Sequence, residues 1–174
     1  LRPPVRRQGG RGQYAFRRTD QNARHQGRLS FAIQGVPDLR EIIYTQRVEF
    51  GDCDPARIVW FPNFFRWIDA ASRHFFVQCG VPPWHETEKT LGVIGTPLVD
   101  THAKFMKTAS YGDTLDIHTS IAEWRGKSFV QRYRVTRGAD AIMECDEVRI
   151  FAGRREDGSM RALEIPAQIR ALCE

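Results

Sequence analysis

The sequence lacks any apolar run that approaches the roughly 18–20 residues of a membrane helix, so we expect nothing in it to span a bilayer. Cysteine is scarce, and no two of the four cysteines form a C-x-x-C pair. No apolar stretch follows the arginine pairs near the start of the chain, which argues against a secretory signal. Widely spaced cysteines in such a chain are typical of reduced thiols. We therefore expect a cytoplasmic protein.

Several catalytic and binding motifs are also missing. The chain contains no G-x-S-x-G elbow, no H-E-x-x-H helix and no glycine-rich loop ahead of a helix, so neither a serine hydrolase of that type nor a nucleotide site is indicated. Four histidines (His74, His85, His102 and His118) are scattered without metal-ligand spacing. We expect these histidines to be structural or solvated, and we expect neither a metal nor a cofactor.

Acidic residues are almost absent from residues 1–30, which hold eight arginines and one aspartate. The formal net charge of +5 therefore belongs to this segment, and the rest of the chain is slightly acidic. Residues 1–38 have too few apolar side chains to offset their ordering entropy, so we predict a disordered basic leader followed by one domain over residues 39–174. An RNA-binding arm and an over-long start are both open interpretations of the leader. We do not expect the folded part to bind nucleic acid.

The rest of the chain shows clear periodicity, and it is rich in phenylalanine (11) and tryptophan (4). Alternating apolar residues predict strands, spacings of three and four predict helices, and glycine-containing turns separate them. The predicted elements are, in order, a strand (39–49), a long helix (61–79), a short helix (84–91), four strands (93–108, 114–124, 127–137 and 141–152) and a terminal helix (164–172). Short connections between long strands imply an antiparallel sheet. The one very apolar helix is the only available cover for its apolar face.

The most informative segment, GDCDPARIVWFPN, covers residues 51–63. Asp52, Asp54 and Pro55 favour a tight turn, and Pro62 favours a helix start at residue 61 or 62. A carboxylate thus precedes a helix N-terminus, whose free N–H groups bind anions. Such an arrangement suits acyl transfer. On spacing alone, capping and turn formation remain the alternative role for these aspartates.

A second cluster of charge, EWRGKS, occupies residues 123–128 at a predicted turn. A basic turn of this kind is often only a solvated edge of the sheet. Its functional interpretation is a cradle for phosphate groups, because arginine and lysine form strong charge-assisted hydrogen bonds.

Residues 43–173 carry a series of motifs that resembles the 4-hydroxybenzoyl-CoA thioesterase family of hotdog proteins. The motifs are GDCDPARIVWFPN (51–63), RWIDAASR (66–73), CGVPPW (79–84), GTP (95–97), TASY (108–111), WRGKSFVQR (124–132), DEVRIFA (146–152) and ALEIPA (162–167). The resemblance implies an α+β hotdog fold, in which an antiparallel five-stranded sheet wraps around one long apolar helix. It also implies a homotetramer with active sites between subunits.

The resemblance further implies hydrolysis of an aromatic acyl-CoA, 4-hydroxybenzoyl-CoA or a close relative, without a metal. Asp54 would attack the thioester carbonyl or activate water, and the backbone N–H of Phe61 would polarise that carbonyl. Asp69 would accept a hydrogen bond from the phenol hydroxyl of the acyl group. The remaining implied contacts are Trp84, Thr96, Pro97 and Leu98 at the acyl pocket, and Arg125, Gly126 and Lys127 at the CoA phosphates.

One departure lies beside the predicted catalytic turn, where Arg57 stands in a position at which the family commonly has glycine. Two other functions stay open at this point. A hotdog thioesterase of different acyl specificity would use Asp69, on the helix, as its catalytic acid. A non-catalytic protein would use the same scaffold to bind acyl-CoA or RNA.

Overall fold

The computed structural model describes residues 40–174, so the predicted leader, residues 1–38, and its interpretation as an RNA-binding arm lie outside the described residues. The elements are β1 (Ile42–Arg47), the 3-10 turn η1 (Phe50–Asp52), α1 (Pro62–Gln78), α2 (Trp84–Leu91), β2 (Leu98–Phe105), β3 (Thr114–Trp124), β4 (Ser128–Arg137), β5 (Asp140–Ile150), β6 (Ala152–Arg154), β7 (Met160–Ala162) and α3 (Ala167–Cys173). None of the described helices is both long enough and apolar enough to cross a membrane.

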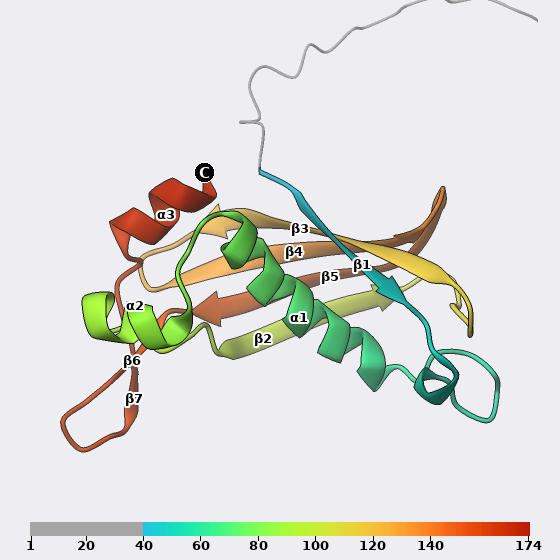
Figure 1. Cartoon of the computed structure of the whole chain (residues 1–174), viewed down its shortest axis with the longest axis horizontal. Helices are drawn as coiled ribbons and strands as arrows, with labels where there is room; N and C mark the ends of the chain where they lie inside the picture. Colours follow the sequence, from blue (N-terminus) through green and yellow to red (C-terminus); the bar gives the residue numbers. More distant parts are fainter. Residues whose placement is uncertain (1–39) are drawn as a thin grey trace, which may run out of the picture. The chain divides into compact units, whose positions relative to one another are not determined.

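Five strands form one antiparallel sheet in the order β1-β3-β4-β5-β2, as Figure 1 shows. Strands β3, β4 and β5 follow one another through short turns and are the interior of the sheet. Their buried and less buried residues alternate, with Leu115, Ile117 and Ile121 on the buried side of β3. Because side chains alternate across a strand, this period of two defines one apolar face that must be covered.

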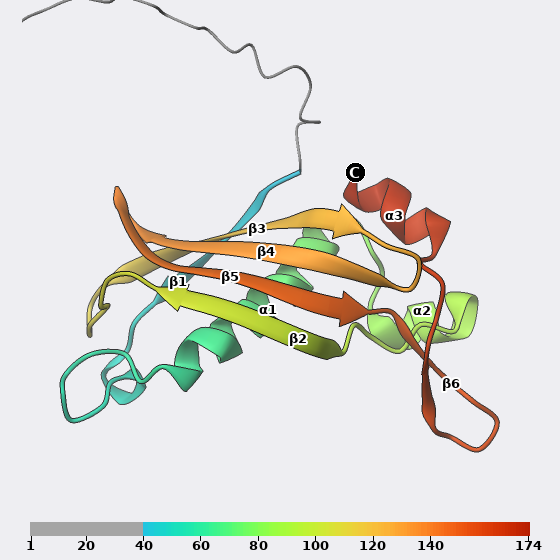
Figure 2. The ribbon, with the colours of Figure 1, turned by 180° about the vertical axis from the view of Figure 1, so that it is seen from behind.

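The long helix α1 covers that face, and it lies across the sheet in both views (Figures 1 and 2). Pro62 begins the helix at a position where the missing N–H has no cost, and Gly80, with a φ of 85°, follows its end. Its buried side carries Phe64, Trp67 and Ile68 towards the N-terminal half. Spacings of three and four residues bring these side chains to one stripe, which packs on β3, β4 and β5.

The C-terminal half of α1 organises a second cluster of aromatic residues. Phe76 is fully buried, and its ring meets those of Trp84, Phe129 and Phe151 at centroid distances of 5.6–5.9 Å. The short helix α3 adds Ile169 and Cys173 to this cluster. The cluster therefore joins α2 and α3 to the sheet at the end where α1 stops.

The predicted α+β fold, with a five-stranded antiparallel sheet wrapped around one long helix, is confirmed. Several boundaries differ from the predicted ones. The first strand is shorter than 39–49 because Glu49 and Asp52 form a reciprocal cap that turns the chain into η1. Strand β2 begins only at Leu98, because Gly95, with a φ of 153°, and Pro97 interrupt the extended chain before it.

The last extended segment also differs from its prediction. Residues 141–152 were predicted as one strand, but β5 ends at Ile150 and the chain continues into the hairpin β6–β7, which the sequence did not reveal. Its strands have three residues each, too few for a recognisable alternation. Helix α3 starts later than residue 164, since Pro166 immediately precedes it.

Candidate active site

The predicted catalytic segment folds as a tight hairpin between β1 and α1. The backbone N–H of Asp54 donates to Ile58 O at 2.9 Å, and the N–H of Arg57 donates back to Asp54 O at 2.8 Å. Cys53 and Val59 form the next antiparallel bridge. Pro55 follows Asp54, at the position where the fixed φ of proline favours such a turn. The hairpin thus holds Asp54 at a defined place ahead of the helix.

The two aspartates of this hairpin have different environments. Asp52 is buried, and both of its carboxylate oxygens are occupied, Oδ2 by the N–H of Glu49 at 2.8 Å and Oδ1 by Arg66 at 3.1 Å. Asp54 is half-buried, and its Oδ1 accepts the N–H of Ala56 at 2.8 Å. Within residues 40–174, Asp54 Oδ2 has no hydrogen-bond partner. Asp52 is therefore a structural cap, whereas Asp54 forms a turn with one oxygen and keeps the other available.

Phe61 occupies the N-cap position of α1, and its N–H donates to no acceptor in the described part of the chain. Pro62 has no N–H to offer, so the Phe61 amide is the donor at the very start of the helix. Only three rungs of the hairpin separate Phe61 from Asp54, a span of about 10 Å in extended chain. Asp54 and the Phe61 amide therefore lie on the same short hairpin, at the N-terminal end of α1.

Four of the predicted substrate-binding residues line one cavity of about 460 Å³ on the α1 side of the sheet. They are Asp69, Thr96, Pro97 and Leu98, and the cavity is completed by Phe65, Thr101, Glu147 and Arg149. Asp54 is not among these lining residues. Trp84 is not among the lining residues; its ring packs on Phe76 in the second aromatic cluster and lies 4.4 Å from the guanidinium of Arg73. Thr96, Pro97 and Leu98 thus meet Asp69 in one cavity, and Trp84 lies outside its lining.

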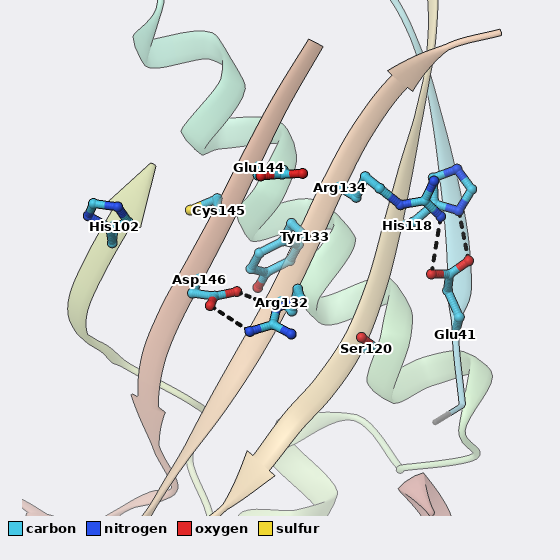
Figure 3. A pocket seen from close by; sticks show the side chains of 10 residues that line it. All are labelled: Glu41, His102, His118, Ser120, Arg132, Tyr133, Arg134, Glu144, Cys145 and Asp146. Atoms are coloured by element: carbon cyan, nitrogen blue, oxygen red, sulfur yellow. Dashed lines mark hydrogen bonds and ion pairs between the residues drawn. The ribbon is translucent and has the colours of Figure 1, made fainter. Parts of the chain in front are cut away.

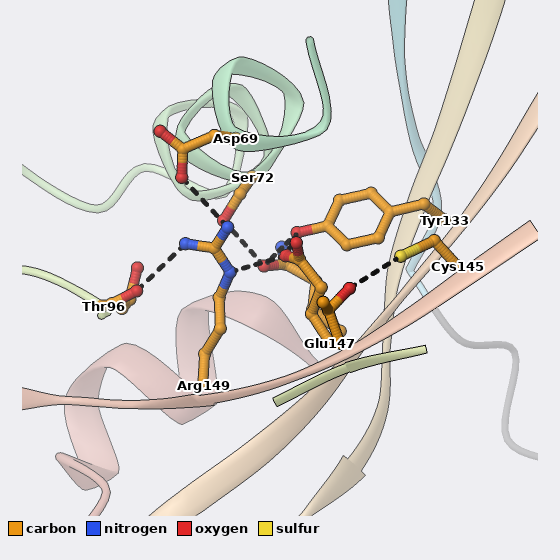
Figure 4. A network of polar contacts seen from close by, with 9 residues as sticks. Asp69, Ser72, Thr96, Tyr133, Cys145, Glu147 and Arg149 are labelled. Carbon is orange, nitrogen blue, oxygen red and sulfur yellow. Dashed lines mark hydrogen bonds and ion pairs between the residues drawn. The ribbon is translucent and has the colours of Figure 1, made fainter. Parts of the chain in front are cut away.

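A network of buried polar groups underlies this cavity (Figure 4). The side chain of Arg149, 5% exposed, donates from Nε to Glu147 Oε2 at 2.8 Å and from Nη2 to Asp69 Oδ1 at 3.0 Å. The hydroxyl of Tyr133 lies 3.0 Å from Glu147 Oε2. Burial, reinforced by the Glu147 charge, raises the pKa of Tyr133, so this phenol stays protonated and can donate.

The guanidinium of Arg149 likewise stays protonated and positively charged. Burial acts to lower the pKa of its guanidinium, but the charge of Glu147 and the hydrogen bonds to Glu147 and Asp69 outweigh burial and raise the pKa above its ordinary value. The sequence interpretation missed Arg149 and Glu147. A signal was present, because both residues share the parity of Met143, Cys145 and Phe151 and so fall on the apolar face of their strand.

The predicted CoA-binding residues form the turn between β3 and β4. Arg125 pairs with Glu123 at 2.8 Å, which raises the pKa of Arg125 and lowers that of Glu123. Lys127 lies 3.4 Å from Glu164, and the carbonyl of Gly126 accepts the N–H of Ile165 at 3.2 Å. Both cations are largely exposed. An incoming phosphate can therefore exchange with the carboxylates at little cost, since exposed ion pairs are weak.

This turn and the Asp54 hairpin lie at opposite ends of the sheet. Arg47, which leads into the hairpin, pairs with Thr114 at the start of β3, whereas the turn follows Trp124 at its end. Eleven residues of strand separate the two, about 35 Å. Figures 1 and 2 show the same separation along α1. One chain thus presents the parts of the predicted site but does not bring all of them together.

The opposite face of the sheet carries a polar groove of about 390 Å³ (Figure 3). Several of its charges are paired with one another, as in the two-pronged contact of Arg132 with Asp146 at 2.8 and 2.9 Å. Arg134 lies 3.6 Å from Glu41. None of the predicted site residues lines this groove. Within the described residues, no three His, Cys, Asp or Glu side chains are grouped so as to hold a metal.

The chain was compared with known proteins. Residues 48–172 match the family model described as the thioesterase-like superfamily. A 4-hydroxybenzoyl-CoA thioesterase from Pseudomonas sp. (strain CBS-3) is 54% identical over 140 residues, which cover 77% of this chain and 98% of that enzyme. The match therefore includes nearly all of the relative and most of the chain described here.

Solved structures give the same result. The structure of a 4-hydroxybenzoyl-CoA thioesterase from the same Pseudomonas strain superposes with a TM-score of 0.73 at 52% identity, covering 77% of this chain and 99% of that one. A mutant 4-hydroxybenzoyl-CoA thioesterase complexed with 4-hydroxybenzoyl-CoA has a TM-score of 0.73 at 51% identity, with 78% and 99% coverage. A gentisyl-coenzyme A thioesterase has a TM-score of 0.64 at 30% identity, with 74% and 99% coverage.

Arg57 adopts a φ of 65°, and it is the only residue other than glycine with a positive φ in the described part of the chain. A side chain in this left-handed region costs about 1 kcal/mol, which glycine avoids. We expect Arg57→Gly to keep or raise the free energy of unfolding by up to about 1 kcal/mol, because the greater entropy of the unfolded glycine chain offsets part of the relief. Arg57→Val, whose branched side chain tolerates this conformation less well, should lower the free energy. Urea denaturation measures both variants, and a glycine variant less stable than the valine variant would contradict the strain.

Proposed function

The chain belongs to the thioesterase-like superfamily, and from this premise we propose that it hydrolyses 4-hydroxybenzoyl-CoA or a closely related aromatic acyl-CoA to the free acid and CoA. The family resemblance stated from the sequence is confirmed by the Pseudomonas relative, and the proposed activity is the one that this relative's name describes. One observation of this chain carries the chemistry. A carboxylate oxygen without a partner in residues 40–174 lies on the hairpin that ends at the free amide of α1.

We assign the reaction to Asp54, acting either as the nucleophile at the thioester carbonyl or as the base that activates water. The hairpin leaves Asp54 Oδ2 available for this step, while Oδ1 is held by Ala56. The Phe61 N–H, at the positive end of the helix dipole, would stabilise the negative charge that develops on the carbonyl oxygen. A thiolate is a good leaving group, so this arrangement needs no metal.

The cavity at Asp69 would receive the aromatic ring. Phe65, Pro97 and Leu98 give it apolar walls, and Asp69 offers a hydrogen-bond acceptor for a ring hydroxyl. Arg125 and Lys127 would bind the CoA phosphates at the exposed β3–β4 turn.

The separation of these parts supports assembly as a homotetramer with sites between subunits. Strand β2 lies at an edge of the sheet and exposes Leu98, Val99 and Phe105, an apolar edge that favours pairing with another chain. A second copy could then bring its β3–β4 turn to the Asp54 hairpin of the first. We also propose a cytoplasmic location, which suits the four free thiols.

A second candidate assigns the catalytic carboxylate to Asp69. This residue lines the cavity whereas Asp54 does not, and its side chain is 74% exposed. Its Oδ1 is already bound to Arg149, however, and it lies on the second turn of α1 rather than at the helix N-terminus. The first candidate is therefore the better supported one, and the two are separated by mutation.

We expect Asp54→Asn to lower kcat for 4-hydroxybenzoyl-CoA by at least about 10²-fold, because a general base contributes 10²–10⁴-fold. The isosteric amide keeps the hydrogen bond to Ala56, so the oligomer should stay folded. Asp69→Asn should act mainly on KM. Steady-state kinetics of both variants decide between the candidates, and near-normal turnover by Asp54→Asn with loss in Asp69→Asn would reverse the assignment.

The role of the Phe61 amide is testable because its φ of −52° already suits proline. Phe61→Pro removes only the N–H and the exposed aromatic side chain, and we expect kcat to fall by about 10²–10³-fold, as when one oxyanion donor is lost. Phe61→Ala is the matched control, since it loses the side chain but keeps the donor. Equal kcat values for the two variants would exclude the amide from catalysis.

Sites shared between subunits predict complementation. We combine Asp54→Asn with a double variant of the phosphate rim, Arg125→Glu/Lys127→Glu, by co-expression with two different tags. In a mixed pair of subunits, one site combines an unchanged Asp54 with an unchanged phosphate rim, and the other site carries both changes. Half of the random pairings are mixed, so mixed oligomers should regain about one quarter of the wild-type activity. The same variants purified separately should be inactive. Activity of the mixture that only equals their sum would place each complete site within one subunit.

A further inference from the structure

The side chain of Arg149 lies where three walls of the acyl cavity meet. Its three nitrogens each have a different acceptor: Nε binds Glu147 on β5, Nη1 binds the carbonyl of Thr96 at 3.0 Å, and Nη2 binds Asp69 on α1. Figure 4 shows the guanidinium between these partners. The segment before β2, the long helix and the sheet are therefore connected through one group.

The network gives the cavity an excess negative charge. One guanidinium faces two carboxylates, and the buried partner, Glu147, is 2% exposed and is also approached by the Tyr133 hydroxyl. Asp69 is the outer partner and lines the cavity with a single oxygen, Oδ1, bound to Arg149. Its other oxygen makes no hydrogen bond within residues 40–174, so Asp69 presents a free hydrogen-bond acceptor to the cavity.

We propose that Arg149 is the positioning residue that makes this cavity selective, by fixing Asp69 and the Thr96 wall so that the pocket accepts an acyl ring with a hydrogen-bond donor at its far end and rejects one with an anionic group. This inference rests on the proposed function, because it takes the cavity to be the acyl pocket. It assigns to Arg149 no contact with the thioester. Its effect is transmitted through the groups that it holds.

The geometry requires arginine in particular. A guanidinium is planar and directs its N–H groups in fixed directions, so it can hold three acceptors on three elements at once. A lysine ammonium at this position keeps the positive charge but is a point donor on a flexible stem. A lysine at position 149 would therefore keep Glu147 paired, but it would hold the Asp69 side chain and the Thr96 segment less firmly in place.

The selectivity follows from the cost of desolvating Asp69, whose side chain is 74% exposed, without giving it a new partner. A ring hydroxyl can donate to the free Oδ2 of Asp69, whereas an unsubstituted ring desolvates this oxygen without giving it a donor, which weakens the binding of that ring. A ring carboxylate would lie beside the excess negative charge and would be repelled. The predicted order of affinity is therefore 4-hydroxybenzoyl, then benzoyl, then 4-carboxybenzoyl.

The test measures binding with thioether analogues of these three acyl-CoA esters, which cannot be hydrolysed, by titration calorimetry on the full chain. In the unmodified protein the 4-hydroxy analogue should bind at least about tenfold more tightly than the unsubstituted one, the effect of one hydrogen bond to a charged group. In Arg149→Met this ratio should fall to below about threefold, and in Arg149→Lys it should lie in between. Arg170→Met, which removes an exposed ion pair with Glu174, is the control and should leave the ratio unchanged.

Removal of Arg149 alone leaves Glu147 as a buried charge without a counter-ion, which destabilises the fold of Arg149→Met. The double variant Glu147→Gln/Arg149→Met removes both charges and keeps an acceptor for Tyr133, and the ratio should fall in it as well. A folded variant that binds all the analogues more weakly by one common factor would show a merely structural role and overturn the proposal. An unchanged ratio would do the same.

Failure of the proposed function gives a different result. If the unmodified chain hydrolyses none of the three thioesters yet binds the analogues in the predicted order, the hydrolase assignment is wrong and the role of Arg149 in recognition stands. If it hydrolyses 4-hydroxybenzoyl-CoA but the Arg149 variants keep the selectivity ratio, the activity stands and the role of Arg149 is refuted.

Discussion

A single sheet with one apolar face has to be covered, and in the described part of this chain α1 is the element that covers most of it. The two core clusters both form along this helix, one on Phe64, Trp67 and Ile68 and the other on Phe75 and Phe76. Its buried residues extend from Asn63 and Phe64, in the first turn, to Phe76 near the C-terminus. The position of α1 on the sheet is therefore set by packing over its whole length, and a local rearrangement at one end would disturb the other.

This constraint also positions the chemistry. Phe61 stands at the N-terminus of α1 and Asp69 two turns further on, so the distance between the helix amide and the acyl cavity is fixed by the rise of the helix at about 12 Å. The hairpin carrying Asp54 is tied to the same end through Asp52, whose backbone carbonyl accepts the Asn63 side chain at 2.9 Å and the Trp60 N–H at 2.9 Å. The hairpin, the helix amide and Asp69 are thus all positioned by α1, as precise placement of reacting groups requires.

The features that could be predicted from the sequence are those encoded within short consecutive segments. Alternation in β3 and β4, the three-and-four spacing of α1 and the turn residues around Pro55 are each encoded in fewer than twenty consecutive residues, and they predicted the sheet, the helix and the Asp54 turn. The Arg149 network is not local, because it joins residue 69, residue 96 and residues 131–149 across three elements. Contacts of this kind depend on the register of β4 with β5. The alternation of residues within one strand does not determine that register.

The energetic cost of that network supports a functional interpretation. Glu147 and Arg149 lie among apolar residues on the inner face of β5, where the desolvation of two charges is only partly recovered by their attraction. Apolar residues of similar volume at these positions would be expected to stabilise the fold equally well or better. A charged pair in such a place positions other groups and does not stabilise the fold. Each nitrogen of Arg149 fixes one acceptor, and two of these acceptors, Asp69 and the carbonyl of Thr96, belong to residues that line the cavity. The same polar groups that weaken the core therefore determine the shape and charge of the pocket.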